Sequence, residues 1–301
     1  MYGENRFITR VRPGTDAESK VRPGDQVLGY NNHAVSRSAF WQMNYYFNNL
    51  APQQVSNLDR RDPAGAERKI TVNAKIRDLK KRIDMTGQDG GYDLWDEYLQ
   101  QQNFDHVSRQ RWVDVGDVMV WKMPEFEMED HTVDHIFAGA RKHPTLILDL
   151  RRNPGGAVVT LDRMIGNSFD HEVKITDRVG RKALKPQVAK TRGHDAYSGK
   201  LIVLVDSESA SCAELFSRVI QLEHRGTVIG DRTAGAVMEA RGFDESQGAD
   251  VKVIYSFSIT EADLTMKDGK DPVLTRALEL AGHKVDPVAA GKLLPFKWLP
   301  N

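Results

Sequence analysis

Hydrophobic and polar residues alternate over short distances in the first 80 positions. Segments that predict strands, each bounded by turn residues, lie at 7–11 (FITRV), 26–30 (QVLGY) and 67–76 (ERKITVNAKI). Asn31 and Asn32 suit a tight hairpin turn after the second of these. Phe40, Met43 and Phe47 have the spacing of one helix face. This part of the chain is therefore predicted to be a small β-rich unit with one main helix.

Continuous apolar runs replace this alternation in the rest of the chain. Buried strands are predicted at 117–126, 145–150, 200–206 and 227–231. Segments with helical spacing lie around 133–143, 158–169, 210–226 and 272–282. Strands that alternate with helices in this way predict parallel βαβ units. The polar, mixed segment 79–111 is predicted to be a linker with one short helix at 92–102.

Charge and cysteine content narrow the classes of function. Lys plus Arg and Asp plus Glu both number 42, so no global field favours nucleic acid or an acidic membrane surface. No apolar run approaches the roughly 18 residues of a membrane span, so membrane insertion is not expected. The single cysteine, Cys212, excludes an intramolecular disulfide and a multi-cysteine zinc site. His131 and His135 are spaced like a metal pair, but without a third ligand they favour a solvated helix face. No metal or cofactor is expected.

Two loops carry residues that suit acyl-transfer chemistry. Reactive groups of parallel sheets gather beyond the carboxyl ends of strands. After the strand 145–150, Gly155 and Gly156 allow backbone N–H groups to approach a developing oxyanion. After the strand 200–206, Ser211 begins a helix whose dipole stabilises negative charge, and the Cys212 amide is free to donate. The pattern supplies the nucleophile and the oxyanion donors of a serine hydrolase, but not the general base. The alternative is a capped helix, with other serines of the segment, at 207 and 209, as simple N-caps.

The N-terminal part resembles a PDZ domain of the kind found in bacterial proteases. The residues that carry the resemblance are RPGTDAESKVRPGDQVLGYNN at 12–32, followed by a helix and a final strand. The resemblance covers residues 1–78 and implies a peptide-binding domain, which adds an extended chain end to a sheet edge. The alternative is a small β module without a ligand.

The remainder is similar to the catalytic domain of the C-terminal processing, or tail-specific, serine peptidases. The motifs are LILDLRRNPGG at 146–156, LIVLVDSESASCAELF at 201–216 and GTVIGDRTAG at 226–235. The resemblance implies an α/β fold with a crotonase-like (ClpP/crotonase spiral) peptidase core over 112–301, and a hydrolase that acts on polypeptides. It assigns the nucleophile to Ser211 and the oxyanion hole to Gly155, Gly156 and Cys212. Family members are commonly extracytoplasmic, periplasmic or secreted. No signal peptide is recognisable in this chain, and its compartment and oligomeric state are not readable from the sequence.

The general base departs from the family pattern. The processing peptidases carry a lysine in the turn where this chain has Ala236. A branch similar to the tricorn core peptidases uses a histidine on the strand before the glycine turn, and the proline of VMVWKMPEF aligns Lys122 with it. The sequence thus predicts a Ser211–Lys122 dyad, in which burial must keep the lysine neutral. The acid that would orient the base is unassigned, with Asp268 and Glu239 as guesses.

The sequence is also compatible with two other functions. A catalytically impaired core could support a protein that only binds peptides, which the missing turn lysine and a shortened segment near Asp271 favour. An acyl-thioester enzyme could use the same oxyanion glycines and would bind a coenzyme. Reactivity of Ser211 separates the peptidase from the first alternative, and a comparison of peptide with thioester substrates separates it from the second.

Overall fold

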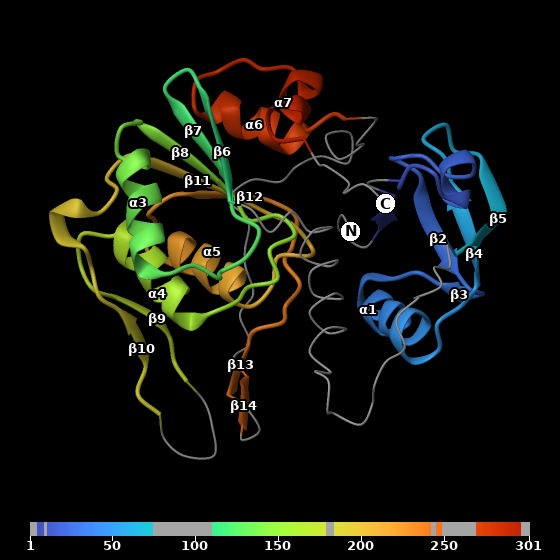
Figure 1. Cartoon of the computed structure of the whole chain (residues 1–301), viewed down its shortest axis with the longest axis horizontal. Coiled ribbons are helices and arrows are strands. Elements are labelled where there is room, and N and C mark those ends of the chain that lie inside the picture. Colours follow the sequence, from blue (N-terminus) through green and yellow to red (C-terminus); the bar gives the residue numbers. More distant parts are fainter. Residues whose placement is uncertain are drawn as a thin grey trace, which may run out of the picture. The chain divides into compact units, whose positions relative to one another are not determined.

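The computed structural model describes residues 5–8, 11–74, 110–178, 184–241, 245–248 and 269–295. The chain divides into two compact units (Figure 1). Unit 1 comprises Met1–Ser108, Thr265–Asp268 and Pro295–Asn301, and unit 2 comprises Arg109–Leu264 and Gly269–Leu294. The predicted helix at 92–102 lies outside the described residues.

Unit 1 contains an antiparallel sheet with the order β1-β2-β4-β5, and β3 pairs with β2. Asn31 and Asn32 adopt positive φ, 46° and 66°, and form the predicted turn between β2 and β3. Ser36 begins the helix by accepting a hydrogen bond from the Ala39 amide (3.2 Å). The elements are β1 (Arg6–Phe7), η1 (Asp16–Ser19), β2 (Gln26–Tyr30), β3 (His33–Ala34), α1 (Arg37–Tyr45), η2 (Tyr46–Leu50), β4 (Val55–Arg61) and β5 (Glu67–Asn73).

Unit 2 is built on a five-stranded sheet with the order β12-β11-β8-β7-β6. β6 is antiparallel to β7, and the other neighbours are parallel, which confirms the predicted βαβ units. The strands are β6 (Arg111–Val115), β7 (Val118–Lys122), β8 (Thr145–Asp149), β11 (Lys200–Val205) and β12 (Thr227–Gly230). Two hairpins accompany the sheet, β9 (Val173–Thr176) with β10 (Gln187–Ala189) and β13 (Met238–Arg241) with β14 (Glu245–Gly248). The helical elements are α3 (Asp130–Ala140), α4 (Val158–Ser168), η3 (Gly193–Asp195), α5 (Cys212–Leu222), α6 (Pro272–Leu280) and α7 (Pro287–Leu293).

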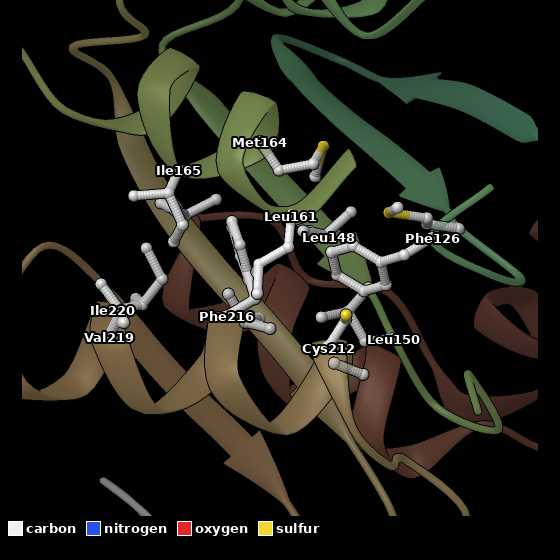
Figure 2. Close-up of a cluster of buried hydrophobic side chains, with 14 of the residues drawn as sticks. Phe126, Leu148, Leu150, Leu161, Met164, Ile165, Cys212, Phe216, Val219 and Ile220 are labelled. Carbon is white, nitrogen blue, oxygen red and sulfur yellow. The ribbon is translucent and has the colours of Figure 1, made fainter. Parts of the chain in front are cut away.

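Each face of this sheet has its own hydrophobic core. On one face α3, α4 and α5 pack against side chains such as Trp121 and Leu148, and Figure 2 shows the part of this cluster that surrounds Phe216 and Cys212. On the other face α6 and α7 cover Val120 and Ile147 (Figure 1). The two sets alternate along each strand, as a period of two requires. The middle parts of these strands are therefore apolar because both faces of the sheet are buried.

Several elements were not predicted. β4 in unit 1 carries mostly polar residues, and its place in the sheet comes from ladders to β2 and β5 on its two sides. β6 begins at the end of the segment that we expected to be a linker. The β9–β10 hairpin and α7 were also missed. No helix in the described ranges is long and apolar enough to cross a membrane.

Candidate active site

Ser211 occupies a strained backbone position at the start of α5. It is the N-cap residue of that helix and has φ 51° and ψ −119°. Few residues other than glycine adopt positive φ, and such a conformation persists only where the surroundings enforce it. The strain therefore singles out Ser211, the serine that the sequence predicts as nucleophile.

A buried carboxylate holds this backbone in place. The side chain of Glu214 has no exposed surface. It accepts hydrogen bonds from the amides of Ser211 (3.0 Å), Gly235 (2.7 Å) and Ala236 (2.9 Å). The Ser211 amide also lies 3.1 Å from the Ala236 carbonyl oxygen. Glu214 thus holds the turn that follows β12 against Ser211, and residue 236 lies beside that serine.

The glycine turn after β8 packs directly against the serine. A Cβ atom on Gly155 would lie 2.6 Å from Ser211 Cβ and 2.9 Å from the Cys212 nitrogen. Gly155 and Gly156 also have φ of 100° and 138°, a region that other residues rarely adopt. The structure therefore brings Ser211, Cys212 and both predicted glycines together, and only glycine fits at 155.

The amides of these residues are not equivalent. The Gly155 amide donates to Asn153 Oδ1 (2.8 Å) and is engaged within the turn. Within the described part of the chain, neither the Gly156 amide nor the Cys212 amide donates to an acceptor. Cys212 is the first residue of α5, where amides have no partner inside the helix. Two unengaged N–H groups beside a serine hydroxyl are the donor set that an oxyanion requires.

The thiol of Cys212, next to Ser211, is not in a reactive state. Cys212 is buried, and its Sγ lies 3.2 Å from the Gly156 carbonyl oxygen. Burial raises the pKa of the Cys212 thiol to about 11. At neutral pH the sulfur therefore stays protonated and a poor nucleophile. Its contacts are those of a small core residue.

Lys122 is engaged in an ion pair in this structure, and its dyad with Ser211 stays a prediction. Its Nζ atom donates to Asp149 Oδ1 (3.1 Å) and to the Arg151 carbonyl oxygen. Because Trp121 packs on the face that carries α5, alternation directs Lys122 to the face that carries α6. No contact joins Lys122 to Ser211 among the residues that the structure describes. The side chain is 19% exposed and ion-paired.

The ion pair of Lys122 belongs to a larger charge network. Arg151 bonds both oxygens of Asp271 (2.8 Å each) and also binds Asp149. Burial alone would raise the pKa of Asp149, but the positive charges of Arg151 and Lys122 outweigh it and hold that pKa well below its ordinary value. Asp271 also caps α6 by accepting from the Leu274 amide (2.9 Å). This network joins the glycine turn to α6.

Two further polar residues shape the site and were missed by the sequence reasoning. Asn153 is fully buried inside the glycine turn. Asp206, at the end of β11, accepts from the amides of Arg152 (2.8 Å) and Glu208 (3.0 Å). Burial, together with the negative charge of Glu208, raises the pKa of Asp206. The bonds from Asn153 to the Gly155 amide and from Asp206 to the Glu208 amide could have been predicted from the sequence, because Asn and Asp side chains at turns commonly accept from the backbone amide two residues later.

Other sequence candidates do not enter the described site. For Glu239 the structure describes only a backbone position in β13, and Asp268 lies outside the described residues. His131 is exposed and pairs with Glu129 (3.1 Å). In the ranges that the structure covers, no group of three or more His, Cys, Asp or Glu side chains could hold a metal ion.

Known proteins match both the sequence and the fold. The tail-specific protease of Haemophilus influenzae is 26% identical over 79% of this chain and 32% of that protein. The carboxyl-terminal-processing protease of Synechocystis is 32% identical over 36% of this chain and 25% of that protein. The chain thus spans about a third or less of the curated relatives it matches.

A solved structure of mature CPAF with lactacystin matches with a TM-score of 0.50 at 13% identity, over 82% of this chain and 72% of that chain. At that identity the likeness shows the fold alone. The family model described as peptidase family S41 matches residues 117–270. Because that match spans just over half of the 301 residues, the chain belongs to peptidase family S41.

Proposed function

We propose that this protein is a serine-type peptidase that cleaves unfolded or tail-exposed polypeptides. The observation that carries the proposal is Ser211, held at positive φ at the start of α5 next to two unengaged amides. The names of the relatives, tail-specific protease and carboxyl-terminal-processing protease, support this class of substrate. No coenzyme is part of the proposal, which sets it apart from an acyl-thioester enzyme.

The reaction follows from this geometry. Ser211 Oγ attacks the carbonyl carbon of the scissile peptide bond and passes its proton to a general base. The negative oxygen of the tetrahedral intermediate is held by the amides of Gly156 and Cys212, each worth about 2.7–4 kcal/mol. The C–N bond then breaks, and the leaving amine takes up the proton. Water hydrolyses the resulting ester and regenerates Ser211. Gly155 forms the wall of this oxyanion hole, because its own amide is bound to Asn153.

Lys122 is the candidate base in this proposal. It can act as the base only after its ion pair with Asp149 is broken. An ammonium group that is bound to Asp149 and to the Arg151 carbonyl cannot accept a proton. To act as the base, Lys122 must leave both partners, release one proton to solvent and turn toward Ser211 as a neutral amine when substrate binds. A base role therefore predicts that a change at Asp149 alters the reactivity of the serine.

The proposal assigns a delivery role to the N-terminal part. Residues 1–78 form a PDZ-like domain, 79–111 a linker and 112–301 a crotonase-like peptidase core. The antiparallel sheet and helix α1 of unit 1 support the first assignment. Such a domain captures a chain end and raises its local concentration at a linked active site. The protein acts outside the cytoplasm, as its family commonly does.

Labelling with a fluorophosphonate serine probe tests the proposal. We expect the parent to label between pH 6 and 10 and Ser211→Ala to lose all labelling. Loss in Lys122→Ala as well would establish the lysine as the base, whereas parental labelling of that variant would exclude it. If the parent does not label although it is folded, the peptidase reading fails and the chain is a peptide-binding protein.

A further inference from the structure

Asn153 lies at the point where three segments of the candidate site meet. Its side chain and backbone are fully buried. Its Nδ2 donates to the Met123 carbonyl (3.0 Å), and its Oδ1 accepts from the Gly155 amide (2.8 Å). Its backbone carbonyl accepts from the Ala210 amide (2.9 Å). One residue thus bonds the end of β7, the glycine turn and the loop that leads into Ser211.

The first of the two oxyanion donors is oriented through this residue. The Gly155 carbonyl oxygen accepts from the Phe126 amide (2.7 Å), which fixes one side of the peptide unit between Gly155 and Gly156. In a trans peptide the N–H points opposite to the C=O. The Gly156 N–H therefore points away from Phe126. Asn153 holds the amide at the other end of Gly155, so the glycine cannot rotate despite its permissive backbone.

The second donor, the Cys212 amide, is linked to Asn153 through the chain segment that precedes it. Ala210 precedes Ser211, and Cys212 follows it. Because the Asn153 carbonyl anchors the Ala210 amide, the loop that carries the Cys212 N–H keeps its place relative to the glycine turn. The turn itself is strained, since Arg152 has φ 64° next to Asn153. The bond from the Arg152 amide to Asp206 and the contact of Cys212 Sγ with the Gly156 carbonyl oxygen also join the two loops, and Asn153 adds the bonds nearest to the Gly155 and Ala210 amides.

We propose that Asn153 is a positioning residue that sets the separation of the Gly156 and Cys212 amides, and so controls stabilisation of the oxyanion at Ser211. This inference rests on the proposed function of Ser211. Asn153 does not touch the substrate. Its effect is exerted through the two donors, and it should appear in the rate of the chemical step, not in the binding of substrate.

The rate constants of fluorophosphonate labelling test this role. In that reaction a bond forms between Ser211 Oγ and phosphorus, the P–F bond breaks, fluoride leaves, and the serine proton goes to the base. The phosphoryl oxygen occupies the oxyanion position, so the maximal rate reports on the donors and the half-saturation concentration reports on binding. We expect Asn153→Ala to lower the maximal rate about 10- to 100-fold, with half-saturation within about twofold of the parent.

A second variant supplies a signature that a merely structural role would not produce. Asn153→Asp keeps the shape, and its carboxyl, when protonated, can still donate to the Met123 carbonyl and accept from the Gly155 amide. Burial raises the pKa of such a carboxyl. The ratio of variant to parent rate should therefore approach one at low pH and fall as the introduced carboxyl ionises. Asn167→Asp, at a second buried asparagine in α4, is the matched control and should leave the ratio constant.

Hydrogen exchange of the amides separates this proposal from the proposed function. Asn153→Ala removes the side-chain bonds to Met123 and Gly155 but keeps the backbone carbonyl that binds Ala210. If the side chain holds that carbonyl in place, the variant should speed exchange at both Gly155 and Ala210, while the amides of β8 and β11 keep their protection. This measurement needs no catalysis, so it decides the role of Asn153 even if the parent does not label. Faster exchange at Gly155 alone would overturn the proposal, as would a parental maximal labelling rate in folded Asn153→Ala.

Discussion

Replacement of Glu214 by glutamine should destabilise unit 2 well beyond the effect of an ordinary charge removal. The carboxylate is fully buried and accepts three backbone N–H groups. A glutamine offers one oxygen and one NH₂ group. If the oxygen takes the place that accepts from Ser211 and Ala236, the NH₂ group faces the Gly235 amide, and two donors oppose each other. An unsatisfied buried donor costs about 1–3 kcal/mol, and each bond that loses its charge weakens by about 1 kcal/mol. Two weakened bonds and one unsatisfied donor together give an expected loss of about 3–5 kcal/mol.

Thermal unfolding measures this loss directly. For a domain of 150–250 residues, 1 kcal/mol corresponds to about 2–4 °C in Tm, so Glu214→Gln should lower Tm by about 6–20 °C. Glu223→Gln is the control, because Glu223 is exposed at the other end of the same helix. That control should change Tm by less than about 2 °C. A Tm of Glu214→Gln within the same small range would refute the role that we assign to this carboxylate.

Three more variants test separate parts of the site. Because burial raises the pKa of Asp206 above its unfolded value of about 3.9, its contribution to stability is lost as pH rises through the folded pKa. The Tm of Asp206→Asn minus that of the parent should therefore increase as pH rises from 4 to 8. A Tm difference that stays constant with pH would contradict this. Gly155→Ala places a Cβ 2.6 Å from Ser211 Cβ and should lower probe labelling at least about 100-fold. Gly193→Ala, also at positive φ but with open space around it, should label like the parent. Ala236→Lys should raise labelling at neutral pH about 10-fold or more, because residue 236 lies against the Ser211 backbone; unchanged labelling would show that a lysine there does not reach the hydroxyl.

The parallel core was predictable because its strands are buried on both faces. The strands 145–150 and 200–206 contain the apolar runs Leu146–Leu148 and Leu201–Val205, and a segment with helical spacing follows each of them. β4 has no such pattern. Its residues Val55–Arg61 are mainly polar, and pairing with β2 and β5 defines it as a strand. Pairing of this kind depends on tertiary context, which local hydrophobic patterns do not contain.

The position of the candidate nucleophile at the start of a helix could be predicted from the sequence, whereas the bonding of the individual amides could not. The sequence alone predicts a serine at the start of a helix that follows a buried strand. Whether Gly155 or Gly156 has an unengaged N–H depends on one side-chain bond, from the Gly155 amide to Asn153 Oδ1. The sequence places Asn153 two residues before Gly155, the spacing of an Asx turn, so this bond could have been proposed. The bond from Asn153 to Ala210 joins residues far apart in sequence and required the fold.

The position of Lys122 follows from the handedness of the connections once the strand order is known. The strands β7, β8, β11 and β12 succeed one another across the sheet in a single direction. Right-handed crossovers then place the connecting helices α3, α4 and α5 on one face. Trp121 faces these helices, so Lys122, one residue later, must face the other side, where it meets the network of Asp149 and Arg151. The residues of β7 that alternate with Lys122, such as Trp121, point instead into the core on the face that α5 covers. A lysine base on this strand therefore has to reach Ser211 around the end of the sheet, and its bonds to Asp149 and to the Arg151 carbonyl oxygen oppose that movement.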